Sequence, residues 1–198
     1  GTLGNDCAYI AVTPTPTGRH IVFVTNRQIR FAEAWTDSET MSYDLSAGIL
    51  DINDQDKSKS TGVVYPLAQL VVDKQGRAYV GNFGFDREKG EAPRTTAMVR
   101  VDPDGTTSVA ADELMFPNGT VITPDGRTLV VGETFAQRLT AFDIEPNGSL
   151  VNRRVFAQFS DVYPDGICLD AEGAIWVADP VGRRGVRVVG GGEIKETI

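Results

Sequence analysis

Two tripeptides of nearly the same form place a polar side chain at matching points of the sequence. Asn118 lies in Phe-Pro-Asn-Gly and Asp165 in Tyr-Pro-Asp-Gly, and each stands eight residues before the glycine of a turn, Gly126 or Gly173. An amide oxygen and a carboxylate are ligands that hard cations such as Ca²⁺ prefer. Pro-Asn-Gly and Pro-Asp-Gly are also ordinary turn sequences, so it is the shared offset that favours a site.

A second group of polar residues follows the same kind of turn. Asn82, Glu133 and Asp179 stand six or seven residues after a turn glycine, where a second β-strand would end. They would either line a pocket there or cap the strand by bonding loop N–H groups. Under the first interpretation Asn82 and Glu133 are expected to bind substrate, and the second interpretation stays open beside it.

These turns belong to a repeat of roughly 50 residues. Its turn glycines are Gly18, Gly76, Gly126 and Gly173. Short apolar runs flank each turn, which predicts two strands joined by a tight two-residue Asp-Gly-type turn. A third apolar strand and a fourth, more polar strand follow in each of the last three units. The innermost strand of a unit is therefore expected to be apolar and the outermost polar.

Four antiparallel strands in each unit predict an all-β fold, a β-propeller of four-stranded blades. We expect one domain over 1–198 with about four blades, at approximately 5–60, 65–112, 113–161 and 162–198. A β-sandwich is the alternative, but its strands would not repeat with this period. The first strand of a propeller blade lines the central channel, so Asn118 and Asp165 are expected to meet at one mouth of that channel.

Composition excludes several classes of function. The net charge is −8, with 27 acidic and 19 basic residues and no basic stripe, which argues against a nucleic-acid partner. No apolar stretch reaches the length of a membrane-spanning helix, and no signal peptide opens the sequence, so a cytoplasmic location without membrane association is expected. The single histidine, His20, leaves one possible base for Ser-His-Asp chemistry.

From about Pro66 onward the sequence resembles the SMP-30/gluconolactonase/luciferin-regenerating-like family. The resemblance is carried by VVDKQGRAYVGNFGFD (71–86), FPNGTVITPDGRTLVVGETFAQRLTAFDIEPNGSL (116–150), NRRVFA (152–157) and YPDGICLDAEGAIWVADP (163–180). It implies a propeller of six blades and a metal-dependent lactonase, a carboxylic ester hydrolase that activates water at an axial divalent cation. Calcium is the expected ion, with zinc, magnesium and manganese as alternatives.

The resemblance also implies roles for individual residues. Asn118 and Asp165 match two of the family's metal ligands, and Asp165 is the expected catalytic base acting on a lactone or sugar-acid lactone. The family's first-blade Glu, in a Glu-Gly-Pro-x-Trp context, has no counterpart in residues 1–30, and Ala68 and Gln69 stand where the family has Asn-Asp. These departures support an alternative, a non-catalytic or incomplete propeller that binds small molecules or proteins. Four blades, two short of six, would expose sheet faces and could self-associate.

Overall fold

The computed structural model describes residues 7–15, 18–25, 28–37, 40–44, 49–51, 67–85 and 90–198, and side chains within 70–85 and 90–198. These residues lie mostly in antiparallel β-strands, and one 3₁₀ turn, η2 (Thr134–Ala136), is present among them. Within the described ranges no helix is long and apolar enough to cross a membrane.

The strands form four sheets in chain order, which we call blades 1 to 4. Blade 1 consists of β1 (Cys7–Thr15), β2 (Gly18–Thr25), β3 (Gln28–Asp37) and β4 (Thr40–Asp44), with β5 (Ile49–Asp51) also paired to β3. Blade 2 consists of β6 (Leu67–Val72), β7 (Ala78–Asn82), β8 (Thr96–Val101) and β9 (Thr107–Leu114). Blade 3 consists of β10 (Pro117–Ile122), β11 (Thr128–Glu133), β12 (Arg138–Ile144) and β13 (Leu150–Gln158). Blade 4 consists of β14 (Ile167–Leu169), β15 (Ile175–Asp179), β16 (Arg184–Val188) and β17 (Ile194–Thr197).

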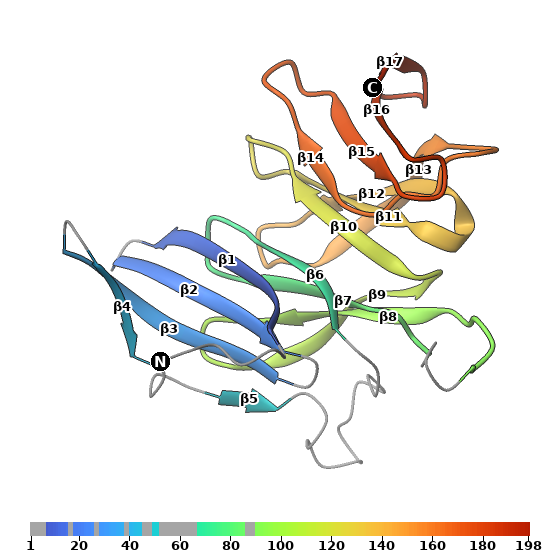
Figure 1. Ribbon diagram of the computed structural model, residues 1–198. Helices are drawn as coiled ribbons and strands as arrows, with labels where there is room; N and C mark the ends of the chain where they lie inside the picture. The colour runs from blue at the N-terminus through green and yellow to red at the C-terminus, as the bar shows by residue number, and fades with distance from the viewer. Residues whose placement is uncertain are drawn as a thin grey trace.

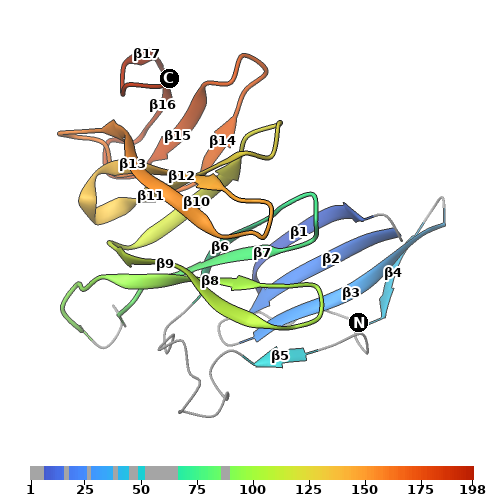
Figure 2. The ribbon, with the colours of Figure 1, turned by 180° about the vertical axis from the view of Figure 1, so that it is seen from behind.

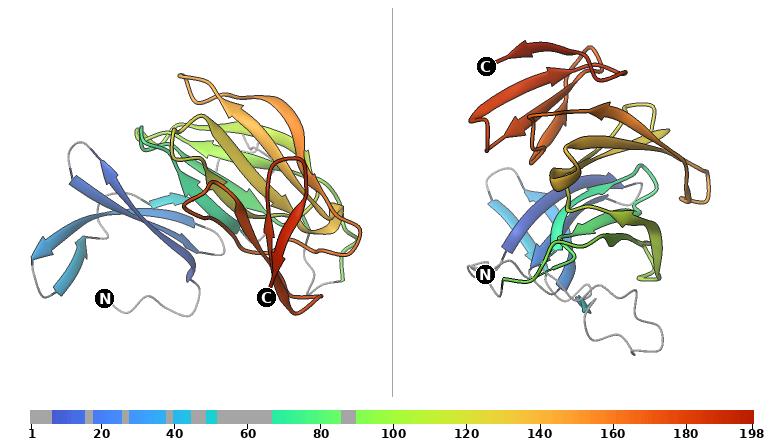
Figure 3. Two further views of the ribbon diagram at one scale, coloured as in Figure 1. Left: turned by 90° about the horizontal axis from the view of Figure 1, so that it is seen from above. Right: turned by 90° about the vertical axis from the view of Figure 1, so that its right-hand side faces the viewer.

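The blades follow one another in an arc from the blue sheet to the red sheet (Figure 1), and the same succession is visible from behind (Figure 2). Contacts join the first strands of successive blades, β1 to β6, β6 to β10 and β10 to β14. Figure 3 shows the later strands of each blade fanning away from this inner row. The prediction of a propeller built from four-stranded antiparallel blades is confirmed.

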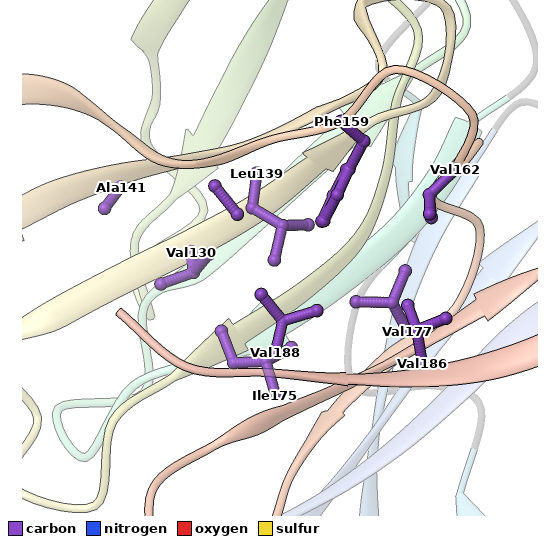
Figure 4. Close-up of a cluster of buried hydrophobic side chains, with 10 residues drawn as sticks. Val130, Leu139, Ala141, Phe159, Val162, Ile175, Val177, Val186 and Val188 are labelled. Atoms are coloured by element: carbon purple, nitrogen blue, oxygen red, sulfur yellow. The ribbon is translucent and has the colours of Figure 1, made fainter. Parts of the chain in front are cut away.

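The core lies between blades, because both faces of an inner sheet are covered. Alternate residues of a strand point to opposite faces, so Leu129 and Val131 of β11 pack toward blade 2 while Val130 packs toward blade 4. Figure 4 shows the second of these interfaces, where Val130 and Leu139 face Ile175 and Val188. The continuous apolar runs in the sequence reflect this two-sided burial.

The hairpin that joins the first two strands differs from the predicted two-residue turn. In blade 2 the Asp73 N–H donates to Arg77 O and the Gly76 N–H donates to Asp73 O, both at 3.0 Å, which leaves a three-residue loop. Gly76 has a φ of +82°, in the left-handed region that favours glycine. A type I turn followed by such a residue suits the twist of a hairpin. Asp170 and Gly173 repeat the arrangement in blade 4.

Blade 3 is fixed to blade 2 by polar contacts at the hairpin end of the sheets. Buried Arg77 pairs with Asp73 at 2.6 Å and donates to Pro146 O at 2.8 Å, while the Tyr79 hydroxyl donates to Gly148 O at 3.0 Å. Burial, followed by the nearby Asp73 charge, raises the pKa of Tyr79 to about 12. These contacts hold the hairpin ends of blades 2 and 3 in register. Because the strands are continuous, their opposite ends are held in register as well.

Candidate active site

The structure brings Asn118 and Asp165 together. Asn118 lies in β10, the first strand of blade 3, and Asp165 lies two residues before β14, the first strand of blade 4. The Asn118 Nδ2 donates to Asp165 Oδ1 at 2.6 Å. Asn118 is 8% exposed and Asp165 is partly exposed, so solvent reaches the pair mainly at Asp165. The predicted meeting of Asn118 and Asp165 is therefore present in the structure, and their role as a site stays a prediction.

The backbone fixes the same contact. The Gly119 N–H donates to Asp165 O at 2.9 Å, and the Asp165 N–H donates to Ala178 O at 3.0 Å. Asp165 is thus held between β10 and β15 by its own main chain. With the backbone held, the hydrogen bond from Asn118 orients the Asp165 carboxylate, which favours a preorganised site.

Thr134 is a third member of the candidate site, and the sequence pattern does not indicate it. Its hydroxyl donates to Pro164 O at 2.6 Å and lies 3.5 Å from Asn118 Nδ2. Thr134 is 9% exposed and follows directly after Glu133 at the end of β11. The sequence signal that could have found it is its position, immediately after the strand-end residue Glu133, which pairs with Pro117 next to Asn118.

Gly119 is a fourth member, and its small size has a specific reason. A Cβ at this position would overlap Asp165 O and would lie 2.5 Å from Ile167 N. Only glycine lets β10 and β14 approach this closely, although φ at Gly119 is not positive. The Gly of Pro-Asn-Gly is therefore required by packing between blades, whereas the sequence suggested only a turn.

We expect Gly119→Ala to lower the free energy of unfolding by about 3 kcal/mol, because the added methyl group must push two backbones apart. Gly173→Ala is the matched control, since that glycine has a φ of +82° but open space around its Cβ position. The control should cost only about 1 kcal/mol, from backbone strain. Urea unfolding of both variants measures the difference, and equal losses would show that the approach of the two strands is not limiting.

Asn82 ends β7, and its side chain bonds within blade 2. Its Nδ2 donates to Ala97 O at 2.6 Å, and its Oδ1 accepts from Gly84 N at 2.9 Å and from the Thr96 hydroxyl at 2.5 Å. Asn82 is 1% exposed. These contacts tie the strand end to the neighbouring strand and the following loop.

Glu133 ends β11, and its carboxylate is fully buried. Arg138 donates to both oxygens at 2.8 and 3.0 Å, the Thr140 hydroxyl donates at 2.5 Å, and the Met115 N–H donates at 2.7 Å. Burial alone would raise the pKa of Glu133, but the hydrogen bonds from Arg138, Thr140 and Met115 outweigh it and hold the pKa below its ordinary value. Glu133 is therefore ionised at neutral pH.

Asp179 repeats this arrangement at the end of β15. It is 1% exposed and accepts from Tyr163 N at 3.2 Å, from Gly182 N at 3.0 Å and from Arg184 Nε at 3.0 Å. Burial opposes ionisation, yet these donors lower the pKa of Asp179. The structure therefore gives all three strand-end residues partners near their own strand ends. The prediction that Asn82 and Glu133 bind substrate stays a prediction.

Comparison with known proteins places this chain in a family. The model of the SMP-30/Gluconolactonase/LRE-like region matches residues 11–198. The chain belongs to this family. The resemblance noted from Pro66 onward is confirmed, and the match extends it through most of blade 1.

Named proteins resemble this chain in sequence or in fold. The chain is 31% identical over 109 residues to L-arabinolactonase from Azospirillum brasilense, an alignment that covers 53% of the chain and 36% of that protein. A solved luciferin-regenerating enzyme has a TM-score of 0.71 at 20% identity, covering 96% of this chain and 61% of that one. The calcium-binding protein regucalcin from Agrobacterium tumefaciens has a TM-score of 0.59 at 16% identity, covering 98% and 75%.

The two solved structures show the fold, and the curated relatives add lactonases to the family. The chain spans less than half the length of the first curated relatives it matches. Lactonase chemistry is thus present in the SMP-30/Gluconolactonase/LRE-like family, and its presence in this chain has to be argued from the site.

The donor set of the Asn118–Asp165 pair suits a hard divalent cation. An amide oxygen and a carboxylate match the oxygen ligands of Ca²⁺, which takes six to eight of them. In this structure Asn118 turns its Nδ2 toward Asp165, so its amide would turn over to present the oxygen to a shared cation. Within the described ranges, no three Asp, Glu, His or Cys side chains converge as a metal cluster. The pair would therefore be completed by water, by backbone carbonyls or by side chains elsewhere in the chain. Asp6 lies outside the described residues, and Glu33 of β3 has only its backbone described.

Proposed function

We propose that this chain carries the hydrolytic site of a metal-dependent lactonase of the gluconolactonase type. The observation that carries the proposal is the 2.6 Å contact between Asn118 Nδ2 and Asp165 Oδ1, made between the entries of adjacent innermost strands. Membership in a family with lactonase relatives supports it. The substrate class is a lactone or a sugar-acid lactone.

Asp165 acts as the general base in this proposal. Its carboxylate takes a proton from a water molecule as the water oxygen attacks the carbonyl carbon of the lactone. The ring C–O bond then breaks, and the proton passes to the departing ring oxygen. The product is a hydroxy acid, and no oxidant or co-reactant other than water is consumed.

Asn118 and Thr134 position the carboxylate for this step. The Asn118 amide engages Oδ1 of Asp165, and Oδ2 is the oxygen that takes the proton in this proposal. Thr134 fixes Pro164, the preceding residue, through its 2.6 Å hydrogen bond. Both contacts are present in the structure, so the Asp165 carboxylate is oriented before a substrate binds.

A divalent cation held by Asn118 and Asp165 would polarise the lactone carbonyl and make nearby water more acidic. Calcium is the ion we propose, with zinc, magnesium and manganese as alternatives, because hard oxygen donors dominate the pair. The calcium-binding description of the Agrobacterium tumefaciens regucalcin supports this choice.

The experiment is a lactone-hydrolysis assay of the chain with each of these ions and with a chelator. We expect turnover in the presence of calcium, its loss on chelation and its return when calcium is added back. Turnover that is unaffected by the chelator would contradict the metal requirement. Binding of lactones without turnover under any condition would favour the alternative, a non-catalytic binding propeller.

A further inference from the structure

Four phenylalanine rings gather on the same face of the molecule as the Asn118–Asp165 pair. They come from the loop after β7, from the connection between β9 and β10, and from η2. Their centroid separations run from 4.3 Å between Phe83 and Phe116 to 5.9 Å between Phe85 and Phe135. We call Phe83, Phe85, Phe116 and Phe135 the phenylalanine cluster. Three neighbouring connections therefore contribute to one aromatic patch.

Chain direction places this cluster at the mouth where Asp165 lies. β7, β9 and β11 all end at the mouth where β10 begins, because neighbouring strands of each blade are antiparallel. Phe116 stands two residues before Asn118, and Phe135 directly follows Thr134, whose hydroxyl lies 3.5 Å from Asn118 Nδ2. The phenylalanine cluster therefore adjoins the Asn118–Asp165 pair at two points. Phe116 lies beside Asn118 in sequence, and Phe135 lies beside Thr134.

Within the cluster, Phe135 is the ring that solvent reaches most clearly. Phe85 is 3% exposed and Phe116 is 5% exposed, whereas Phe135 is 39% exposed. Phe135 packs on both buried rings, at 5.9 Å from Phe85 and 4.7 Å from Phe116. An exposed ring supported in this way loses little freedom when it contacts a ligand.

The backbone around Phe135 is also fixed. The Thr134 N–H donates to Phe116 O at 3.1 Å, and the Gln137 N–H donates to Thr134 O at 3.2 Å. Phe116 has a φ of +56°, an uncommon conformation for a bulky residue. Such strained positions persist where the surroundings enforce them, and they cluster at ligand sites.

Among the side chains that the structure describes, the two polar groups at the ends of β7 and β11 already have hydrogen-bond partners. Asn82 bonds Ala97, Gly84 and Thr96, and the carboxylate of Glu133 accepts from Arg138, Thr140 and Met115. These two described side chains are therefore engaged within the protein rather than free for the hydroxyls of a sugar-like substrate. The surface that a ligand would meet on this side of the mouth is the phenylalanine cluster.

From these observations we infer that Phe135, backed by the phenylalanine cluster, binds an apolar or aromatic substituent of the substrate. The inference rests on the proposed lactonase function and specifies its substrate class, a lactone that carries a hydrophobic side group. The lactone ring lies at Asp165, and its substituent lies against the exposed ring of Phe135. Asn82 and Glu133 then hold the strand ends that support the cluster.

Two lactones with the same ring test the inference, one unsubstituted and one with a phenyl group. We expect Phe135→Ala to raise KM for the phenyl lactone about tenfold, the loss of one aromatic contact, with kcat unchanged and no effect on the unsubstituted lactone. Phe135→Trp keeps an aromatic face and should keep KM low. Val155→Ala, which removes an exposed side chain on β13, is the matched control and should change neither.

A binding measurement separates this inference from the proposed function. Calorimetric titration with the corresponding phenyl lactam, which resists hydrolysis, should show binding that weakens about tenfold in Phe135→Ala and not in Val155→Ala. Lactam binding of this kind without turnover of any lactone would sink the lactonase proposal and leave the role of Phe135 standing. Lactone turnover with equal KM values in Phe135→Ala and the parent chain would overturn the inference about Phe135.

Discussion

Asp165→Asn is expected to lower kcat for lactone hydrolysis by on the order of 10²–10⁴-fold, the range for loss of a general base. The substitution keeps the shape of the side chain, and its amide oxygen can still accept the hydrogen bond from Asn118 Nδ2. What it removes is the negative charge and the ability to take a proton. The melting temperature should therefore change little while turnover is lost.

Asp112→Asn is the matched control, since Asp112 is an exposed carboxylate of β9, the outermost strand of blade 2. It changes the net charge by the same amount and should leave kcat unaltered. Initial rates with one lactone, measured for both variants beside the parent chain, decide the matter. A drop of less than tenfold in Asp165→Asn would assign the proton transfer to another group.

Glu133→Ala should produce the largest loss of stability among the substitutions considered. It leaves Arg138 without its buried partner and takes the acceptor from Thr140 and from Met115 N. Breaking a buried ion pair by removing one partner costs about 3–5 kcal/mol. For a domain of this size that corresponds to a fall of roughly 10 °C in the melting temperature. Differential scanning calorimetry measures it.

Glu196→Ala is the control for this effect, because Glu196 is exposed on β17. Its melting temperature should stay within about 2 °C of the parent, as for other surface substitutions. If both variants melt alike, the Glu133 network contributes nothing to stability. Stability lost in Glu133→Ala together with a normal KM in the residual folded protein would support a role in holding the strand end.

The pH dependence of stability follows from the same network. The folded-state pKa of Glu133 is lowered from its ordinary value of 4.5. A lowered pKa means that the stabilisation is present above about pH 4.5 and is lost as pH falls through the lower folded-state value. The parent chain should therefore lose its advantage over Glu133→Ala in acid, and the two melting temperatures should converge there.

The sequence predicted the architecture because the propeller repeat is written locally. Apolar runs on both sides of Gly76 and Gly126 specify strands and turns without long-range information. The meeting of Asn118 and Asp165 also followed, since equal offsets in successive blades place residues at equal heights along adjacent first strands. These inferences needed only strand direction and period.

Contacts between connections could not be predicted in the same way. Phe83, Phe116 and Phe135 lie in three separate loops, and no period relates their positions in the sequence. Thr134 and Gly119 likewise matter through atoms of blade 4, in particular Pro164 O and Asp165 O. Such roles depend on how closely two blades approach, which single-chain patterns do not contain.

The sequence also could not decide between the two interpretations of Glu133. A polar residue at a strand end fitted both a pocket and a cap, and the choice depends on partners such as Arg138 on the neighbouring strand. The three donors around its carboxylate come from the connection before β10 and from β12. Their convergence is a property of the folded sheet, and it directs Glu133 into its own blade.

A double-mutant cycle of Asn118→Ala and Asp165→Asn tests the central claim most directly. If the pair acts as a unit, each single variant lowers kcat/KM for lactone hydrolysis at least tenfold, and the double variant is no worse than the more damaged single. Losses that multiply in the double variant would show that the two residues act independently. A parent chain and three variants with the same kcat/KM would contradict the site altogether.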